Sequence, residues 1–202
     1  MAVELLSTDI ITFMGYLAPF LMMFVLFLLS VFSGNIVKGF IYLFGIVLIS
    51  TLCIVLSKFI KKPIPDTALY ACRMFSFNNL LDFTTPSIST AIMWFSFVYI
   101  LVPMFSVGQV NAWLTVFLAL MSLINMGSKY SAGCTDFLGL FTGTVLGIAC
   151  GFAYYAIING ITESPSNYFF ISETSSDRKV CSRPSQQEFK CKVYKGGELV
   201  TG

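Results

Sequence analysis

The sequence predicts an all-α membrane protein, with about five transmembrane helices in a bundle followed by a polar C-terminal tail. Hydrophobic residues make up 56% of the 202 residues and charged residues 11%, whereas soluble domains carry about 25% charged residues. The mean hydropathy is +0.83. The apolar residues gather in runs close to the length of about 20 residues that crosses a bilayer as a helix. Because backbone groups in lipid must be hydrogen-bonded within the segment, each run is expected to be helical.

The predicted spans follow one another with connections of unequal length. Short connections join the first span to the second and the third to the fourth, which predicts two tight hairpins. A polar loop at about 58–90 separates the second and third spans, and loops of this length are often functional. The stretch GSKYSAGCTDFLG, residues 127–139, precedes and enters the fifth span. The five spans cover about residues 10–33, 39–57, 91–107, 110–126 and 137–158.

An odd number of spans places the long loop and residues 127–139 on one side of the membrane, together with the N-terminus, and the tail on the other. The N-terminal residues have no basic region, and the first apolar run is too long for a signal-peptide core, so we expect it to be retained. The positive-inside rule weakly favours a cytoplasmic loop side, because cations near the spans are more numerous there. On the loop side they are Lys58, Lys61, Lys62, Arg73 and Lys129; on the tail side they are Lys38, Arg178 and Lys179.

Residues 162–202 form a polar tail with two interpretations. It is either a flexible extension or a small element that docks a protein partner. The stretch FKCKVY alternates and is followed by Gly196 and Gly197, a pattern typical of a hairpin. Cys181 and Cys191 are candidates for a disulfide if the tail faces an oxidising compartment. The other cysteines, Cys53, Cys72, Cys134 and Cys150, are expected to behave as small buried hydrophobes.

Composition argues against several functions. The chain has no histidine, and so lacks the usual general base and the commonest metal ligand. We therefore expect no metal and no cofactor. The net charge is only +2, and the cations are not interleaved with aromatic residues, so nucleic acid is not an expected partner. The last three predicted spans contain no acidic or basic residue, which argues against a proton-coupled transporter.

A glycine ladder runs along the fifth predicted span. Glycines spaced four apart form one stripe on a helix, and in lipid they allow backbones to approach closely. The stripe is either a homodimer seam or, as we favour, a packing surface inside this protein's own bundle. The ladder consists of Gly139, Gly143, Gly147 and Gly151.

Three fragments on the loop side, KFIKKPIP, TPSIST and SKYSAGCTDFLGLFTG, resemble the motifs of the type 2 phosphatidic acid phosphatase family, which includes bacterial acid phosphatases and vanadium haloperoxidases. The family motifs are K-x6-R-P, P-S-G-H and S-R-x5-H-x3-D. As in the membrane members, the first fragment closes a span, the second opens the next and the third enters the last. The resemblance covers roughly residues 15–160 and implies the lipid-phosphatase bundle. The positions that correspond to the motifs are Lys58, Ile64, Pro65, Pro86, Ser87, Ser89, Ser128, Lys129, Thr135 and Gly139.

The sequence departs from the family at every reacting group. Thr135 stands at the nucleophilic histidine, Gly139 at the orienting aspartate and Ser89 at the acid histidine. Lys129 replaces an arginine, and so lacks the bidentate fork that suits phosphate oxygens. Covalent catalysis needs an activated nucleophile. The resemblance therefore implies a pseudoenzyme without catalytic residues.

We expect an integral, multi-pass, non-catalytic protein that serves as a structural, assembly or anchoring component of a membrane complex or virus particle, with the tail docking a protein partner. The alternative is a protein that binds or moves phospholipid, with anionic headgroups at Lys58, Lys61, Lys62, Arg73 and Lys129. A residual lipid phosphatase is a third, weaker expectation. Endomembranes and virion membranes both fit, as do homo- and hetero-oligomers.

Overall fold

The computed structural model describes residues 2–32, 34, 36–62, 72, 85–108, 110–161, 194–195 and 198–199. The side chains of residues 2–12, of residue 107 and of the strand residues lie outside this description. Several residues singled out from the sequence also lie outside it, namely Ile64, Pro65, Arg73, Cys181 and Cys191.

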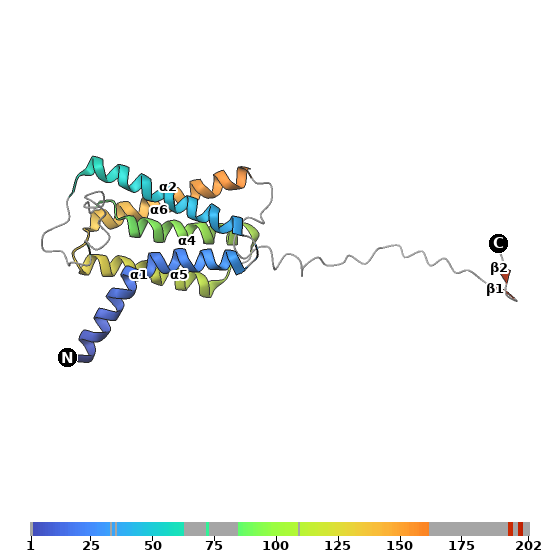
Figure 1. Cartoon of the computed structure of the whole chain (residues 1–202), viewed down its shortest axis with the longest axis horizontal. Helices are drawn as coiled ribbons and strands as arrows, with labels where there is room; N and C mark the ends of the chain where they lie inside the picture. Colours follow the sequence, from blue (N-terminus) through green and yellow to red (C-terminus); the bar gives the residue numbers. More distant parts are fainter. Residues whose placement is uncertain are drawn as a thin grey trace. The chain divides into compact units, whose positions relative to one another are not determined.

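Within the described residues, five helices are long and apolar enough to cross a membrane, which confirms an all-α, multi-pass integral membrane protein. They run antiparallel to their chain neighbours in one bundle (Figure 1). The helices are α1 (Ala2–Phe32), α2 (Ile36–Ile60), α4 (Ile88–Val107), α5 (Ala112–Ser131) and α6 (Phe137–Ile161).

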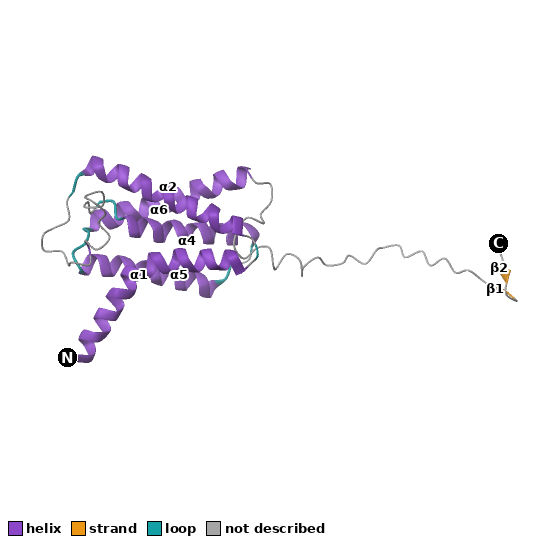
Figure 2. Ribbon diagram, in the orientation of Figure 1, coloured by secondary structure: helices purple, strands orange, loops and turns teal. Residues whose placement is uncertain are grey.

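Helix boundaries follow local signals. Asn111 caps α5, and its Oδ1 accepts a hydrogen bond from Leu114 N at 3.2 Å, which satisfies a backbone donor of the first turn. Gly108 ends α4 in the left-handed conformation, with φ of 71°, which glycine adopts without strain. The predicted end of the fourth span at Met126 is wrong, because α5 continues to Ser131 and leaves only residues 132–136 as the connection (Figure 2).

Helix α4 lies at the centre of the bundle, and it is the most buried of the five spans. It packs most extensively on α6 and also contacts α2, α5 and α1. Aromatic rings from three helices meet around it: Phe95 and Tyr99 of α4 lie beside Tyr42 of α2 and Tyr154 of α6, with ring centroids 5.5 to 6.1 Å apart. The Tyr42 hydroxyl reaches Ser96 Oγ at 2.7 Å, so a buried polar group is satisfied within the bundle.

The glycine ladder of α6 faces α4. A Cβ atom on Gly143 would lie 2.7 Å from Ser87 O, and one on Gly147 would lie 2.5 Å from Ala91 O. At Gly151 it would lie 2.8 Å from Val98 Cβ. Only a hydrogen fits at these positions, so the ladder is the surface on which the α4 backbone approaches α6.

The α1–α5 seam is held by a polar contact. Pro19 has no N–H, so the carbonyl four residues earlier, that of Gly15, loses its helical donor. Asn125 of α5 supplies the missing donor, with its Nδ2 at 2.7 Å from Gly15 O. Gly15 also lies against Ser128, since a Cβ on Gly15 would fall 2.1 Å from Ser128 Oγ.

The tail unit, residues 173–202, contains a short antiparallel strand pair. Strand β1 (Tyr194–Lys195) pairs with β2 (Glu198–Leu199), in the register Tyr194 to Leu199 and Lys195 to Glu198. The pair flanks the Gly-Gly dipeptide at which the sequence predicts a turn.

Candidate functional site at the loop end of the bundle

The three motif-like segments meet at one end of the bundle. We call the end that carries Lys62, Ser87 and residues 132–136 the loop end, and the opposite end, where α6 finishes at Ile161, the tail end. Ser87 N, at the start of α4, donates to Gly139 O, near the start of α6, at 3.0 Å. Lys62, just beyond α2, forms an ion pair with Asp136, just before α6. The ends of α2, α4 and α6 are therefore connected here by polar contacts.

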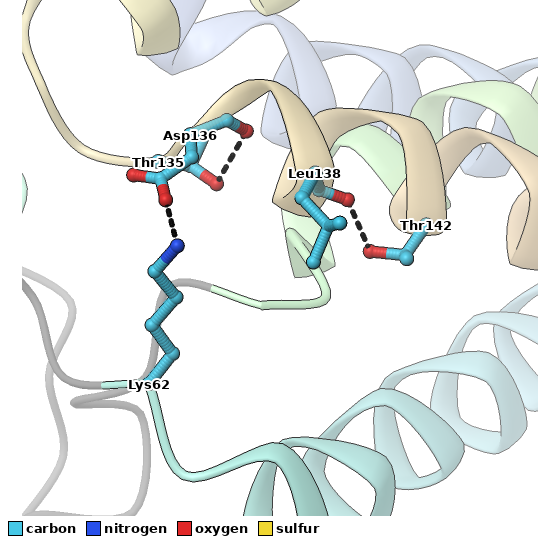
Figure 3. Close-up of polar contacts among 5 residues, drawn as sticks. All are labelled: Lys62, Thr135, Asp136, Leu138 and Thr142. Carbon is cyan, nitrogen blue, oxygen red and sulfur yellow. Dashed lines mark hydrogen bonds and ion pairs between the residues drawn. The ribbon is translucent and has the colours of Figure 1, made fainter.

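Figure 3 shows how the Lys62 side chain extends from the end of α2 toward the carboxylate of Asp136. Both side chains are partly exposed, at 46% and 41%. Beside them, the Thr135 hydroxyl lies 3.5 Å from the backbone oxygen of Asp136 (Figure 3). Thr135 itself is only 5% exposed. The Thr135 hydroxyl is therefore shielded from solvent and directed at a backbone carbonyl.

Lys129 lies on the α1 side of the loop end. Its Nζ sits 4.7 Å from the centroid of the Tyr16 ring, within the distance at which a cation is attracted to an aromatic face. The hydroxyl of Tyr16 lies 2.9 Å from Cys134 Sγ. The residue that occupies the phosphate-arginine position of the resemblance is thus held by a ring of α1.

A disulfide joins Cys72 of the long loop to Cys134 of the α5–α6 connection, with Cα atoms 5.3 Å apart. The prediction that these two cysteines behave as small buried hydrophobes is wrong, because they are bonded to each other. A signal was available, because both cysteines fall on the loop side of the predicted topology. The pairing itself was not readable, since six cysteines allow 15 complete connectivities. Cys53 and Cys150, within α2 and α6, remain free thiols.

The remaining predicted site residues separate into exposed and buried groups. Lys58 and Lys61 are exposed at the end of α2. Pro86 is buried, and the Ser87 hydroxyl lies 3.0 Å from Thr90 Oγ1. Ser89 Oγ is buried and has no hydrogen-bond partner among the described residues. Ser128 belongs to the α1–α5 seam, so the motif-like residues occupy two different seams of the bundle.

The described part of the chain holds no group of three or more His, Cys, Asp or Glu side chains arranged to hold a metal ion. Comparison with known protein families, with curated proteins and with solved structures finds no match.

Proposed function

We propose that this chain is a catalytically inert, degenerate relative of the type 2 phosphatidic acid phosphatases, and that it serves as a structural or assembly component of a membrane complex or virus particle. In this proposal the bundle anchors the protein and residues 162–202 dock a protein partner. The observation that carries it is the packing at the position of the family nucleophile. Thr135 is buried there, and its hydroxyl faces a backbone carbonyl.

The neighbouring groups support a packed rather than a reacting site. The nearest carboxylate in sequence, that of Asp136, is engaged by Lys62. Gly139 occupies the position of the family aspartate and has no side chain; its carbonyl accepts hydrogen bonds from the Ser87 N–H and the Thr142 hydroxyl. An activated nucleophile needs an adjacent base, and these contacts bind helix ends together instead.

The cations of the loop end also favour a structural role over lipid binding. Lys62 is paired with a carboxylate, and Lys129 lies over an aromatic ring. A phosphate headgroup would have to compete with both interactions. The exposed Lys58 and Lys61 favour a second candidate, binding of an anionic phospholipid at the loop end.

The test is co-purification with the gently solubilised full chain, compared with a chain in which residues 162–202 are replaced by a Gly/Ser sequence of equal length. We expect a stoichiometric protein partner that is lost with the tail replacement. Lys58→Ala is the matched control, because it removes an exposed charge and leaves the tail intact; it should retain the partner.

Two outcomes would overturn the proposal. One is an anionic phospholipid bound at one-to-one stoichiometry that survives tail replacement and is lost in Lys129→Ala, which would establish the lipid-binding candidate. The other is turnover of phosphatidic acid by the purified chain that disappears in Thr135→Val, which would establish a residual phosphatase.

A further inference from the structure

The Cys72–Cys134 disulfide bears on whether the compartment at the loop end is oxidising or reducing. Cys72 lies in the polar loop between α2 and α4, and Cys134 lies between α5 and α6. Their Cα separation of 5.3 Å is within the range that a disulfide bridges without backbone movement. Cys134 follows the end of α5 at the loop end of the bundle, and the bond holds Cys72 at the same end.

We propose that the loop end faces an oxidising compartment and that the tail end faces the reducing cytosol. Disulfides persist in oxidising compartments such as the lumen of the secretory pathway or the extracellular side, and they are rare where thiols are kept reduced. Formation of the bond removes two protons and two electrons from the two thiols. A thiol–disulfide oxidoreductase accepts them, and its own disulfide becomes a dithiol.

This orientation reverses the weak preference drawn from charge. The loop side owed that preference to five cations, namely Lys58, Lys61, Lys62, Arg73 and Lys129. The tail end carries Lys38 and six further Lys or Arg residues in 162–202. The positive-inside rule is a bias that acts during insertion, whereas a disulfide on the cytosolic side would face a pool that reduces it.

The orientation has a consequence for the tail. With five crossings, the proposed orientation puts residues 162–202 on the cytosolic side, so we expect Cys181 and Cys191 to be reduced thiols. The protein partner of the tail would then lie on the cytosolic side; the existence of that partner rests on the proposed function. The orientation itself does not depend on any partner.

Two single-substitution glycosylation reporters in the full chain test the orientation. Leu80→Thr completes an Asn-x-Thr acceptor at Asn78 in the long loop, and Glu173→Asn creates an acceptor together with Thr174 and Ser175 in the tail. Each chain is inserted into sealed microsomes, whose exposed face is cytosolic. We expect Leu80→Thr to gain one glycan that an endoglycosidase removes, and Glu173→Asn to gain none. A glycan on Glu173→Asn would overturn the inference.

Thiol labelling decides the orientation even if neither acceptor is glycosylated. A membrane-impermeant maleimide is added to sealed microsomes that contain the unmodified chain, and the labelled peptides are mapped by mass spectrometry. We expect Cys181 and Cys191 to be labelled at once, and Cys72 and Cys134 only after permeabilisation and reduction. Labelling of Cys72 and Cys134 in sealed, unreduced vesicles would refute it, as would protection of the tail thiols until the vesicles are opened. Neither result depends on co-purification, so this inference and the proposed function fail separately.

Discussion

The contact between Asn125 and Gly15 makes a quantitative prediction about the α1–α5 seam. Because Pro19 donates no hydrogen, the carbonyl of Gly15 depends on Asn125 Nδ2, 2.7 Å away. Asn125 is fully buried, and its Oδ1 has no hydrogen-bond partner among the described residues. Asn125→Ala therefore has two opposing effects. It leaves the Gly15 carbonyl unpaired, at a cost of about 1–3 kcal/mol, and it removes an unsatisfied oxygen of similar cost.

A double-mutant cycle separates these effects. Pro19→Ala restores an N–H four residues after Gly15, so the carbonyl no longer needs Asn125. Removal of the unsatisfied Oδ1 contributes in both backgrounds and cancels in the cycle. We expect a coupling energy of about 1 kcal/mol, because hydrogen bonds between membrane helices average about 0.6 and reach about 1.7 kcal/mol.

The assay is equilibrium unfolding of the four chains in mixed micelles. Asn125→Ala should be more destabilising, by the coupling energy, in the parent chain than in Pro19→Ala. The matched control is Pro103→Ala, which removes a proline near the tail end of α4; its effect should add to that of Asn125→Ala. If Asn125→Ala costs the same with and without Pro19, Asn125 does not replace the lost helical donor and the reasoning is refuted.

Three further predictions concern packing, charge and the covalent link. Gly147→Ala should lower the free energy of unfolding by about 1–3 kcal/mol, because its Cβ would lie 2.5 Å from Ala91 O; Gly160→Ala in the same helix meets nothing within 4 Å, and an equal loss there would contradict the packing argument. Lys62→Ala should cost no more than about 1 kcal/mol, less at high salt, because the pair is exposed; a salt-independent loss of about 2 kcal/mol or more would show that the pair acts as a buried one. Cys72→Ser should lower the free energy of unfolding by about 2–4 kcal/mol, since the bond closes a segment with a sequence separation of 62. Reductant should destabilise the parent chain by a similar amount and leave Cys72→Ser unchanged, so an equal effect on both chains would exclude the link as the cause.

Helix ends show where sequence reasoning is less exact than for the helices themselves. Residues 127–131 carry Gly127, Ser128 and Lys129, a composition typical of a connection, yet they continue α5. The helix persists because its buried face still packs there, with Ser128 against Gly15 of α1. Tertiary contact outweighs local propensity at these positions.

The sequence by itself determined the number of spans, the position of the hairpins and the polarity of the tail. These properties are local, because the thickness of the bilayer and the need to satisfy backbone groups act on each segment separately. Only the tertiary structure decided which helices share a seam. Asn125 finds Gly15 across 110 positions, Lys62 finds Asp136 across 74, and Cys72 joins Cys134 across 62. Such partners depend on how the helices are arranged around α4, and no local pattern in the chain encodes that arrangement.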